Sequence, residues 1–366
     1  MKGILYLEDG TVYRGKGFGA PGTRVGELVF NTGMTGYQRT LTDPSYKEQI
    51  ITMTYPMVGN YGVNETDNES DRIHAFGLVV KDVCFRPSNW RSVKTLDEWL
   101  AEQGVPGVYD VDTRDITRRI RETGNQKCVI SNEELPLQKI RELCEQTDLR
   151  GDQMKDAGTD RIVTLQAPEE KYRVAVLDLG VKKSILDELL KRGCTLTLYP
   201  YGTKARIILA DKPDGVFLTN GPGDPAEAKE EIEITEKLIT NCNYGENQMP
   251  IMGICMGHQI LALASGGTTF KMKYGHRGYN HGVFDKESGR SFIVSQNHGY
   301  AVDLSSVILK GMDVTHLNLN DGTVEGMKSL RKPIFSVQFH PESKPGPNDT
   351  SYLFDRFIEL MEGGRL

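Results

Sequence analysis

The sequence predicts an α/β protein of two domains: a β-rich α/β N-terminal domain, then a C-terminal domain with a mostly parallel sheet flanked by helices. The first observation is length, because 366 residues exceed the size of one ordinary hydrophobic core. The second is a change of pattern, from short glycine-rich alternating segments to apolar strands that alternate with amphipathic helices after residue 172. We therefore expect domains at 1–150 and 172–366, joined by a polar linker at 151–171.

The N-terminal half begins with a strong hairpin signal. Two alternating apolar segments, 4–7 and 11–13, flank the turn dipeptide Asp9-Gly10. Helices are expected at 96–103 and 113–122, and Asp112 and Gly124 are suitable capping residues for the second. This half therefore predicts a β-rich structure with a few helices.

The C-terminal half shows the repeating pattern of a parallel sheet. Predicted strands and helices alternate in chain order at 173–177, 184–191, 195–199, 215–219 and 227–239. Beyond Gly266 the pattern changes to short strands and turns, such as 315–319 and 324–327 around Asp321-Gly322, which predict an antiparallel edge. The last segment, 351–362, has apolar residues at helical spacing.

A cysteine lies in the C-terminal half at a predicted strand-to-helix turn. Residues 253–259 read Gly-Ile-Cys-Met-Gly-His-Gln, between a buried strand at 249–254 and an apolar helical stretch at 260–264. This G-x-nucleophile-x-G pattern is typical of an elbow that exposes the nucleophile. The positive end of the helix favours the thiolate, and its free amide groups can stabilise an oxyanion. Cys255 is therefore the candidate nucleophile.

A histidine and a glutamate follow an apolar strand near the end of the chain. The segment 333–339 runs into His340, and the two-residue spacing puts Glu342 on the same side of an extended chain. Glu342 can orient His340, whose other ring nitrogen can exchange a proton with the sulfur of Cys255. Each residue alone could be structural, but the three together predict acyl-transfer chemistry.

A glycine-rich loop follows the predicted strand at 215–219. Residues 220–225 read Asn-Gly-Pro-Gly-Asp-Pro, which by itself is also a common turn sequence. Ligands in open α/β sheets bind at the carboxyl ends of the strands. Gly221, Gly223 and Cys255 can therefore face one pocket.

Composition excludes several classes of function. The net charge of −6, with no run of Lys or Arg, argues against a nucleic-acid-binding surface. The six cysteines are scattered without a C-x-x-C pair, and the pair His276 and His281 has no acidic or cysteine partner at metal spacing, so no metal site is expected. No segment reaches the length of a membrane span, and we expect a soluble cytoplasmic protein.

The motifs together resemble a known family. A Gly-Pro-Gly loop, a G-x-C-x-G-H-Q elbow and a terminal His-Pro-Glu occur here in the order found in class I glutamine amidotransferases, over residues 172–364. Residues 1–150 resemble the N-terminal domain of the carbamoyl-phosphate synthase small-subunit family. That second resemblance rests on segments 29–38, 42–46 and 59–62.

The resemblance implies a reaction and a partner. In this family the cysteine attacks the side-chain amide of L-glutamine, and a glutamyl thioester is hydrolysed to glutamate. The ammonia passes through a tunnel to a large subunit, which makes carbamoyl phosphate from bicarbonate and ATP for arginine or pyrimidine synthesis. This chain lacks a Walker A sequence, so no cofactor is expected in it, and ATP and a divalent metal are expected on the large subunit.

The resemblance also implies glutamine contacts. The family departs slightly from this chain at two of them, since Met256 is commonly Leu and Tyr300 commonly Phe. His258 is expected to be structural, and His298 to bond locally or line the substrate. Besides Cys255, His340 and Glu342, the contacts implied by the family motifs are Ser45, Gly221, Gly223, Met256, Gln259, Asn297, Gly299 and Tyr300.

Two alternatives remain open at this stage. The chain could serve a different biosynthetic synthetase with the same deamidation chemistry, although the N-terminal segments argue against this. It could also be a catalytically silent scaffold subunit, although such a chain would be expected to lose at least one of Cys255, His340 and Glu342.

Overall fold

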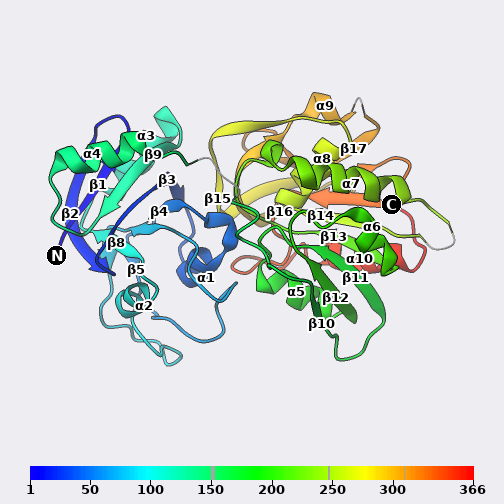
Figure 1. The fold of residues 1–366 in the computed structure, drawn as a ribbon, viewed down its shortest axis with the longest axis horizontal. Coiled ribbons are helices and arrows are strands. Elements are labelled where there is room, and N and C mark those ends of the chain that lie inside the picture. The colour runs from blue at the N-terminus through cyan, green and yellow to red at the C-terminus, as the bar shows by residue number, and fades with distance from the viewer. Residues whose placement is uncertain (150–152, 246–247, 309) are drawn as a thin grey trace. The chain divides into compact units, whose positions relative to one another are not determined.

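The computed structural model describes residues 1–149, 153–245, 248–308 and 310–366. The chain divides into two compact units, Met1–Gly151 and Asp152–Leu366 (Figure 1). The expected boundary at residues 150 and 151 lies outside the described residues.

The N-terminal unit is built on a closed barrel with the strand order β1-β2-β8-β6-β4-β3-β9 (blue to blue-green in Figure 1). The expected hairpin is confirmed, because β1 and β2 pair antiparallel around a turn at Gly10. Both expected helices are also present, and Thr95 and Asp112 cap them through their side chains. The elements are β1 (Lys2–Leu7), β2 (Val12–Gly19), β3 (Thr23–Asn31), α1 (Tyr37–Thr42), η1 (Pro44–Tyr46), β4 (Gln49–Met53), β5 (Met57–Val58), β6 (Gly77–Val79), β7 (Asp82–Val83), α2 (Leu96–Glu102), β8 (Pro106–Tyr109), α3 (Thr113–Thr123), β9 (Gln126–Ser131) and α4 (Leu137–Gln146).

The C-terminal unit contains one mixed sheet with the order β10-β12-β11-β13-β14-β19-β18-β17-β15-β16. Its central strands, from β12 to β19, are parallel, and the strands on either side are antiparallel. The expected parallel sheet with an antiparallel edge is therefore confirmed. The strands are β10 (Val163–Leu165), β11 (Tyr172–Leu177), β12 (Cys194–Tyr199), β13 (Gly215–Leu218), β14 (Ile251–Ile254), β15 (Thr269–Asp285), β16 (Arg290–Val302), β17 (Met312–Asn318), β18 (Val324–Ser329) and β19 (Ile334–Val337).

Helices cover both faces of this sheet. One apolar core includes residues of α6, α7 and α8, and the other includes residues of α5 and α10. The unit is thus an α/β/α sandwich. Its helical elements are α5 (Lys183–Leu190), α6 (Ala205–Ala210), η2 (Pro225–Glu227), α7 (Lys229–Asn241), α8 (Met256–Ala264), α9 (Leu304–Ile308) and α10 (Tyr352–Met361).

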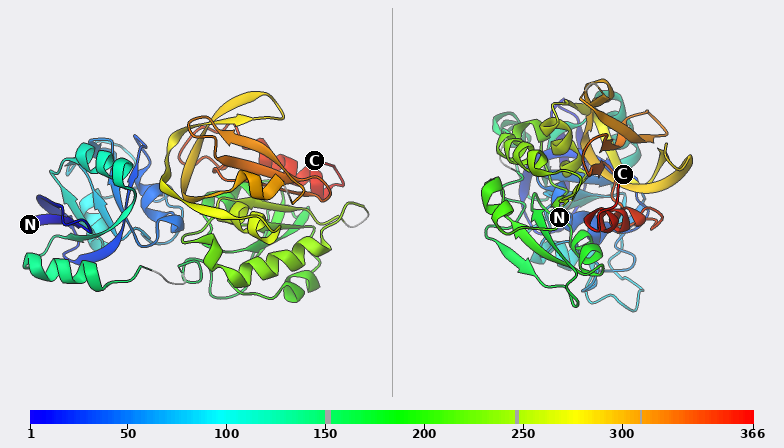
Figure 2. Two further views of the ribbon diagram at one scale, coloured as in Figure 1. Left: turned by 90° about the horizontal axis from the view of Figure 1, so that it is seen from above. Right: turned by 90° about the vertical axis from the view of Figure 1, so that its right-hand side faces the viewer.

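Two features were not foreseen from the sequence. Strand β10 lies inside the expected linker 151–171 and pairs antiparallel with β12, so this part of the segment belongs to the C-terminal sheet. The long strands β15 and β16 form an antiparallel ribbon with register shifts, and Figure 2 shows this yellow ribbon strongly curved. Bulges of this kind bend a strand pair. None of the helices in the described ranges is long and apolar enough to cross a membrane.

Candidate active site

The backbone turns sharply at Cys255, between the end of β14 and the start of α8. Cys255 has a φ of 54°, a conformation that residues other than glycine rarely adopt. The turn brings Gly257 against β13, where its N–H donates to the Thr219 carbonyl at 2.9 Å. A Cβ at position 257 would lie 2.3 Å from the carbonyl oxygen of Leu218, so only glycine fits there. The expected nucleophile elbow is therefore formed.

The thiol of Cys255 is buried beside β16. Only 2% of the residue is exposed, and its Sγ lies 3.6 Å from the carbonyl oxygen of Asn297. The thiol is also close enough to His340 to contribute to raising the pKa of that imidazole. The structure thus brings the sulfur, the histidine and the main chain at Asn297 together.

His340 is held from both the main chain and the side chain. Strand β19 ends at Val337, so the expectation that a strand runs to the imidazole is wrong by a few residues. His340 instead forms an isolated bridge to β16, with its N–H donating to the Ser295 carbonyl at 2.9 Å. Its Nδ1 lies 2.7 Å from Oε1 of Glu342, as the two-residue spacing predicted. Its other nitrogen, Nε2, is buried without a hydrogen-bond partner in the described structure.

The charges of this group depend on one another. Burial alone would lower the pKa of His340, but the Glu342 carboxylate and the Cys255 side chain together outweigh burial and raise it. Burial alone would raise the pKa of Glu342, but Lys182 and His340 hold it well below its usual range. A charged carboxylate beside a protonated imidazole is therefore the favoured state near neutral pH.

Lys182 is a member of this group that sequence reasoning missed. Its Nζ donates to Oε1 of Glu342 at 2.7 Å and to the Lys344 carbonyl at 3.1 Å, and only 5% of its side chain is exposed. Lys182 precedes α5, just after the carboxyl end of β11. This position could have indicated a place near the site from the sequence, because the parallel strands β11, β13 and β14 end at the same edge of the sheet, where ligands bind.

The glycine-rich loop follows β13 and packs on the β11–α5 turn. A Cβ at Gly221 would lie 2.3 Å from the Leu179 carbonyl oxygen, and Gly223 has a φ of 93°. Asn220 fixes the loop, since its side-chain oxygen accepts from the N–H of Lys182 at 3.1 Å. The loop and Cys255 therefore follow neighbouring strands at one edge of the sheet, as expected.

The remaining expected contacts in this unit line up along α8 and β16. Gln259 donates from Nε2 to the Tyr300 carbonyl at 2.7 Å and to Oε1 of Gln338 at 2.9 Å. Met256 is buried in the core against α6 and α7. Asn297 is buried next to the thiol, and Gly299 lies beside the guanidinium of Arg277. The side chain of Gln259 thus connects α8 to β16.

Ser45 belongs to the N-terminal unit. It lies in η1, where its N–H donates to the Asp43 carboxylate at 3.0 Å, and 6% of the residue is exposed. The site described above is confined to the C-terminal unit. The role of Ser45 in glutamine binding stays a prediction.

The two histidines near the elbow are both buried. His258 is fully buried, burial lowers its pKa to about 3, and its Nδ1 lies 2.9 Å from the Ser336 hydroxyl. With so low a pKa, His258 stays neutral and is not assigned a role in proton transfer. Its contact with Ser336 holds α8 against β19. His298 bonds locally, through Nδ1, to the Tyr300 carbonyl at 2.8 Å.

Two models of known protein domains match this chain, one in each unit. Residues 175–360 match the model of the class I glutamine amidotransferases, so the C-terminal unit is a class I glutamine amidotransferase domain. Residues 5–130 match the model described as the carbamoyl-phosphate synthase small chain, CPSase domain.

Full-length relatives agree with both matches. The chain is 52% identical to a carbamoyl phosphate synthase small chain of Clostridium acetobutylicum, over 98% of this chain and 100% of that one. A small chain of Fusobacterium nucleatum is 49% identical, covering 98% of each chain. A pyrimidine-specific small chain of Lactiplantibacillus plantarum is 47% identical, over 99% of this chain and 96% of that one. This chain belongs to the carbamoyl phosphate synthase small-chain family.

Proposed function

We propose that this chain hydrolyses L-glutamine through a Cys255 thioester and delivers the ammonia to a carbamoyl-phosphate synthase large subunit. The observation that carries the proposal is the placement of the Cys255 thiol at a strained elbow beside an imidazole that Glu342 orients. Nucleophile, base and orienting carboxylate are the three roles that acyl transfer requires.

The first half-reaction forms the thioester. The thiol proton already rests on Nε2 of His340, in keeping with the raised pKa of that imidazole, and the Cys255 thiolate attacks the side-chain amide carbon of glutamine, forming a C–S bond as the C=O π electrons move to the oxygen. Main-chain N–H groups at Met256 and in the Gly221–Gly223 loop stabilise the negative oxygen of the tetrahedral intermediate. His340 then donates its proton to the departing nitrogen, the C–N bond breaks and ammonia leaves.

The second half-reaction restores the Cys255 thiolate and the protonated imidazole of His340. His340 takes a proton from water, which attacks the thioester carbon, and the C–S bond breaks as glutamate forms. Glu342 keeps the imidazole in one orientation throughout, and Lys182 keeps Glu342 ionised. In this proposal Gln259, Asn297, Gly299 and Tyr300 form the glutamine pocket, and Ser45 is carried over as a glutamine contact from the family motifs alone.

The partner and the compartment belong to the same proposal. Membership of the small-chain family supports a large-subunit partner that uses ATP, a divalent cation and bicarbonate. This chain supplies no Walker A sequence for ATP and needs no cofactor for the thioester chemistry. A reducing cytoplasm suits it, since all six cysteines fall in the described ranges and are free thiols.

The test measures ammonia and glutamate release from L-glutamine by the chain alone and with its large subunit, ATP and bicarbonate. We expect weak release alone, faster release in the complex, and loss of at least about 10³-fold in Cys255→Ser. The same variant complex should still make carbamoyl phosphate from added ammonia. Glutamine hydrolysis that persists in Cys255→Ser would contradict the nucleophile, and loss of ammonia-dependent synthesis would assign Cys255 to assembly instead.

A further inference from the structure

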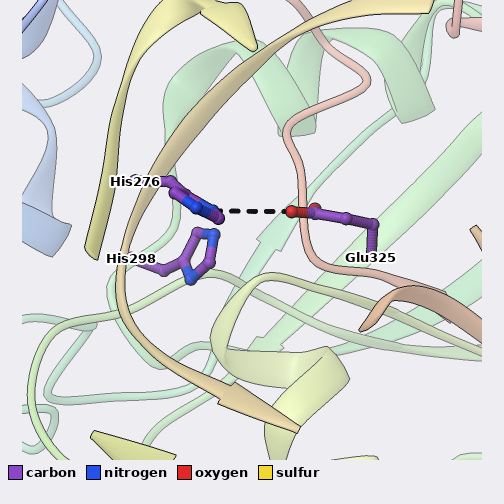
Figure 3. A group of neighbouring side chains, drawn as sticks. All are labelled: His276, His298 and Glu325. Carbon is purple, nitrogen blue, oxygen red and sulfur yellow. Dashed lines mark ion pairs between the residues drawn. The ribbon is translucent and has the colours of Figure 1, made fainter. Parts of the chain in front are cut away.

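A second group of buried polar side chains lies on the antiparallel side of the C-terminal sheet. His276 on β15, His298 on β16 and Glu325 on β18 each offer one ligand atom, and these atoms lie within 4.8 Å of one another (Figure 3). His276 and His298 are 5% exposed and Glu325 is fully buried. The two histidines are direct partners in the β15–β16 ladder, so the sheet itself places their rings together.

His298 turns an unused lone pair toward this group. Its Nδ1 lies 2.8 Å from the Tyr300 carbonyl, which can only accept, so Nδ1 carries the proton. The Tyr300 carbonyl thus fixes the tautomer of the ring, in which Nε2 is the nitrogen that carries the free lone pair. Nε2 is buried without a hydrogen-bond partner in the described structure. Figure 3 shows this outer nitrogen directed at His276.

His276 and Glu325 complete the arrangement. Nε2 of His276 lies 3.0 Å from the Asp321 carboxylate, while its Nδ1 lies 3.6 Å from Oε1 of Glu325. Glu325 accepts one hydrogen bond at Oε1, from Asn318 at 3.0 Å, and its Oε2 is buried without a partner among the described residues. A buried carboxylate oxygen and a buried imidazole nitrogen both without donors are costly unless a cation satisfies them.

We propose that His276, His298 and Glu325 form a binding site for a divalent transition-metal ion of the zinc type. Two imidazole nitrogens and one carboxylate oxygen are a common ligand set for Zn²⁺. Each histidine also has the outer partner that metal-ligating histidines use, since His276 bonds to the Asp321 carboxylate and His298 to a main-chain carbonyl. Ligand atoms about 3.4 Å apart surround a tetrahedral ion with bonds of ~2.1 Å, so small side-chain rotations close the site.

Sequence spacing did not reveal this group. His276 and His281 are close in the chain, but the acidic partners of His276 come from the distant segment that includes Asp321 and Glu325. The site is separate from the thiol, although Tyr300 links the two regions, because its carbonyl accepts from both His298 and Gln259. A direct measurement of metal binding does not depend on glutamine turnover, so failure of the metal site is distinct from failure of the glutaminase proposal.

The experiment is equilibrium dialysis of Zn²⁺ against the full chain carrying Cys255→Ser, which removes the thiol as a competing ligand. We expect one saturable equivalent per chain. His276→Gln and Glu325→Gln should each weaken binding by about 10–100-fold or more, the range known for perturbing metal ligation. His316→Gln is the matched control, since His316 is a buried histidine on β17 bonded to Thr315 and outside the group, and it should bind as before.

Two outcomes would overturn the site. One is no saturable equivalent in the Cys255→Ser chain, which would leave His276 as a protein-only partner of Glu325 and Asp321. The other is binding that His276→Gln and Glu325→Gln do not weaken. Should either variant fail to fold, judged by its thermal melt without metal, anomalous diffraction at the zinc edge from Zn²⁺-soaked crystals of the Cys255→Ser chain decides. A peak bonded to His276, His298 and Glu325 supports the proposal, and its absence there refutes it.

Discussion

The imidazole–carboxylate groups at His340 and at His276, both in the C-terminal unit, differ in their third neighbour. At His340 the carboxylate is Glu342, and the neighbouring group is the Cys255 thiol. At His276 the carboxylates are Glu325 and Asp321, and the neighbouring group is a second imidazole. In both places burial alone would lower the pKa of the imidazole, and the carboxylates raise it instead. At these two positions the carboxylates therefore favour the charged imidazole, whereas the group on the other side decides what each histidine can do.

Removing the imidazole beside the thiol should have the largest effect on glutamine hydrolysis, and it tests whether His340 differs in function from His276. His340→Asn should lower kcat for glutamine hydrolysis by at least about 10³-fold, because proton transfer to and from the sulfur and the leaving nitrogen is lost. Steady-state ammonia release measures the effect. His74→Asn, at a buried histidine of the N-terminal unit, serves as the control and should have little effect. Comparable losses in both variants would mean that His340 acts through folding.

Removing the orienting carboxylate should have a smaller effect. Glu342→Gln keeps the shape of the side chain but loses one charged hydrogen bond, and we expect kcat to fall by about 10²-fold, or ~2.7 kcal/mol. Without the carboxylate, burial dominates and the pKa of His340 falls, so the alkaline limb of the kcat/KM profile should move to lower pH. A loss as large as that of Cys255→Ser would show that Glu342 does more than orient the imidazole.

The smallest loss of glutamine hydrolysis is expected on changing Lys182, which acts on the thiol only through its hydrogen bond to Glu342. Lys182→Met should lower kcat by about tenfold, or ~1.4 kcal/mol of barrier. Lys182 lowers the pKa of Glu342, and its loss should therefore raise that pKa and move the acid limb of the activity profile to higher pH.

The Lys182→Met chain should also be less stable toward acid than the wild-type chain. A depressed carboxyl pKa contributes stability above the unfolded value of 4.5, and this stability is lost as pH falls through the folded pKa. Lys182→Met should thus begin to unfold at a higher pH than the wild-type chain in an acid titration. An unchanged acid limb together with an unchanged acid unfolding midpoint would remove Lys182 from the electrostatic network.

Local signals explain how much could be predicted from the sequence. The elbow at Cys255 and the pair His340 and Glu342 depend on spacings of a few residues, and so do the hairpin at the N-terminus and the parallel strands around β14. The α/β fold class was confirmed for these reasons. The glutamine contacts all remain predictions that rest on the family motifs: Ser45, Gly221, Gly223, Met256, Gln259, Asn297, Gly299 and Tyr300.

The missed features depend on contacts between distant segments. Lys182 reaches Glu342 across 160 positions of the chain, and His276 meets Glu325 only because β15, β17 and β18 pair side by side. The barrel of the N-terminal unit closes through the pairing of β1 with β9, which spacing along the chain does not encode. A lone lysine or glutamate in a sequence carries no sign of such a partner.

The φ of 54° at Cys255 also bears on how this protein can evolve. Glycine adopts such a backbone freely, whereas a residue with a Cβ is strained there by about 1–3 kcal/mol. A Cys255→Gly chain would relieve that strain and lose its sulfur, so at this position the demands of folding and of chemistry favour different residues. Backbone strain alone would favour glycine at this position, so the reason for a cysteine here lies in the chemistry of its sulfur.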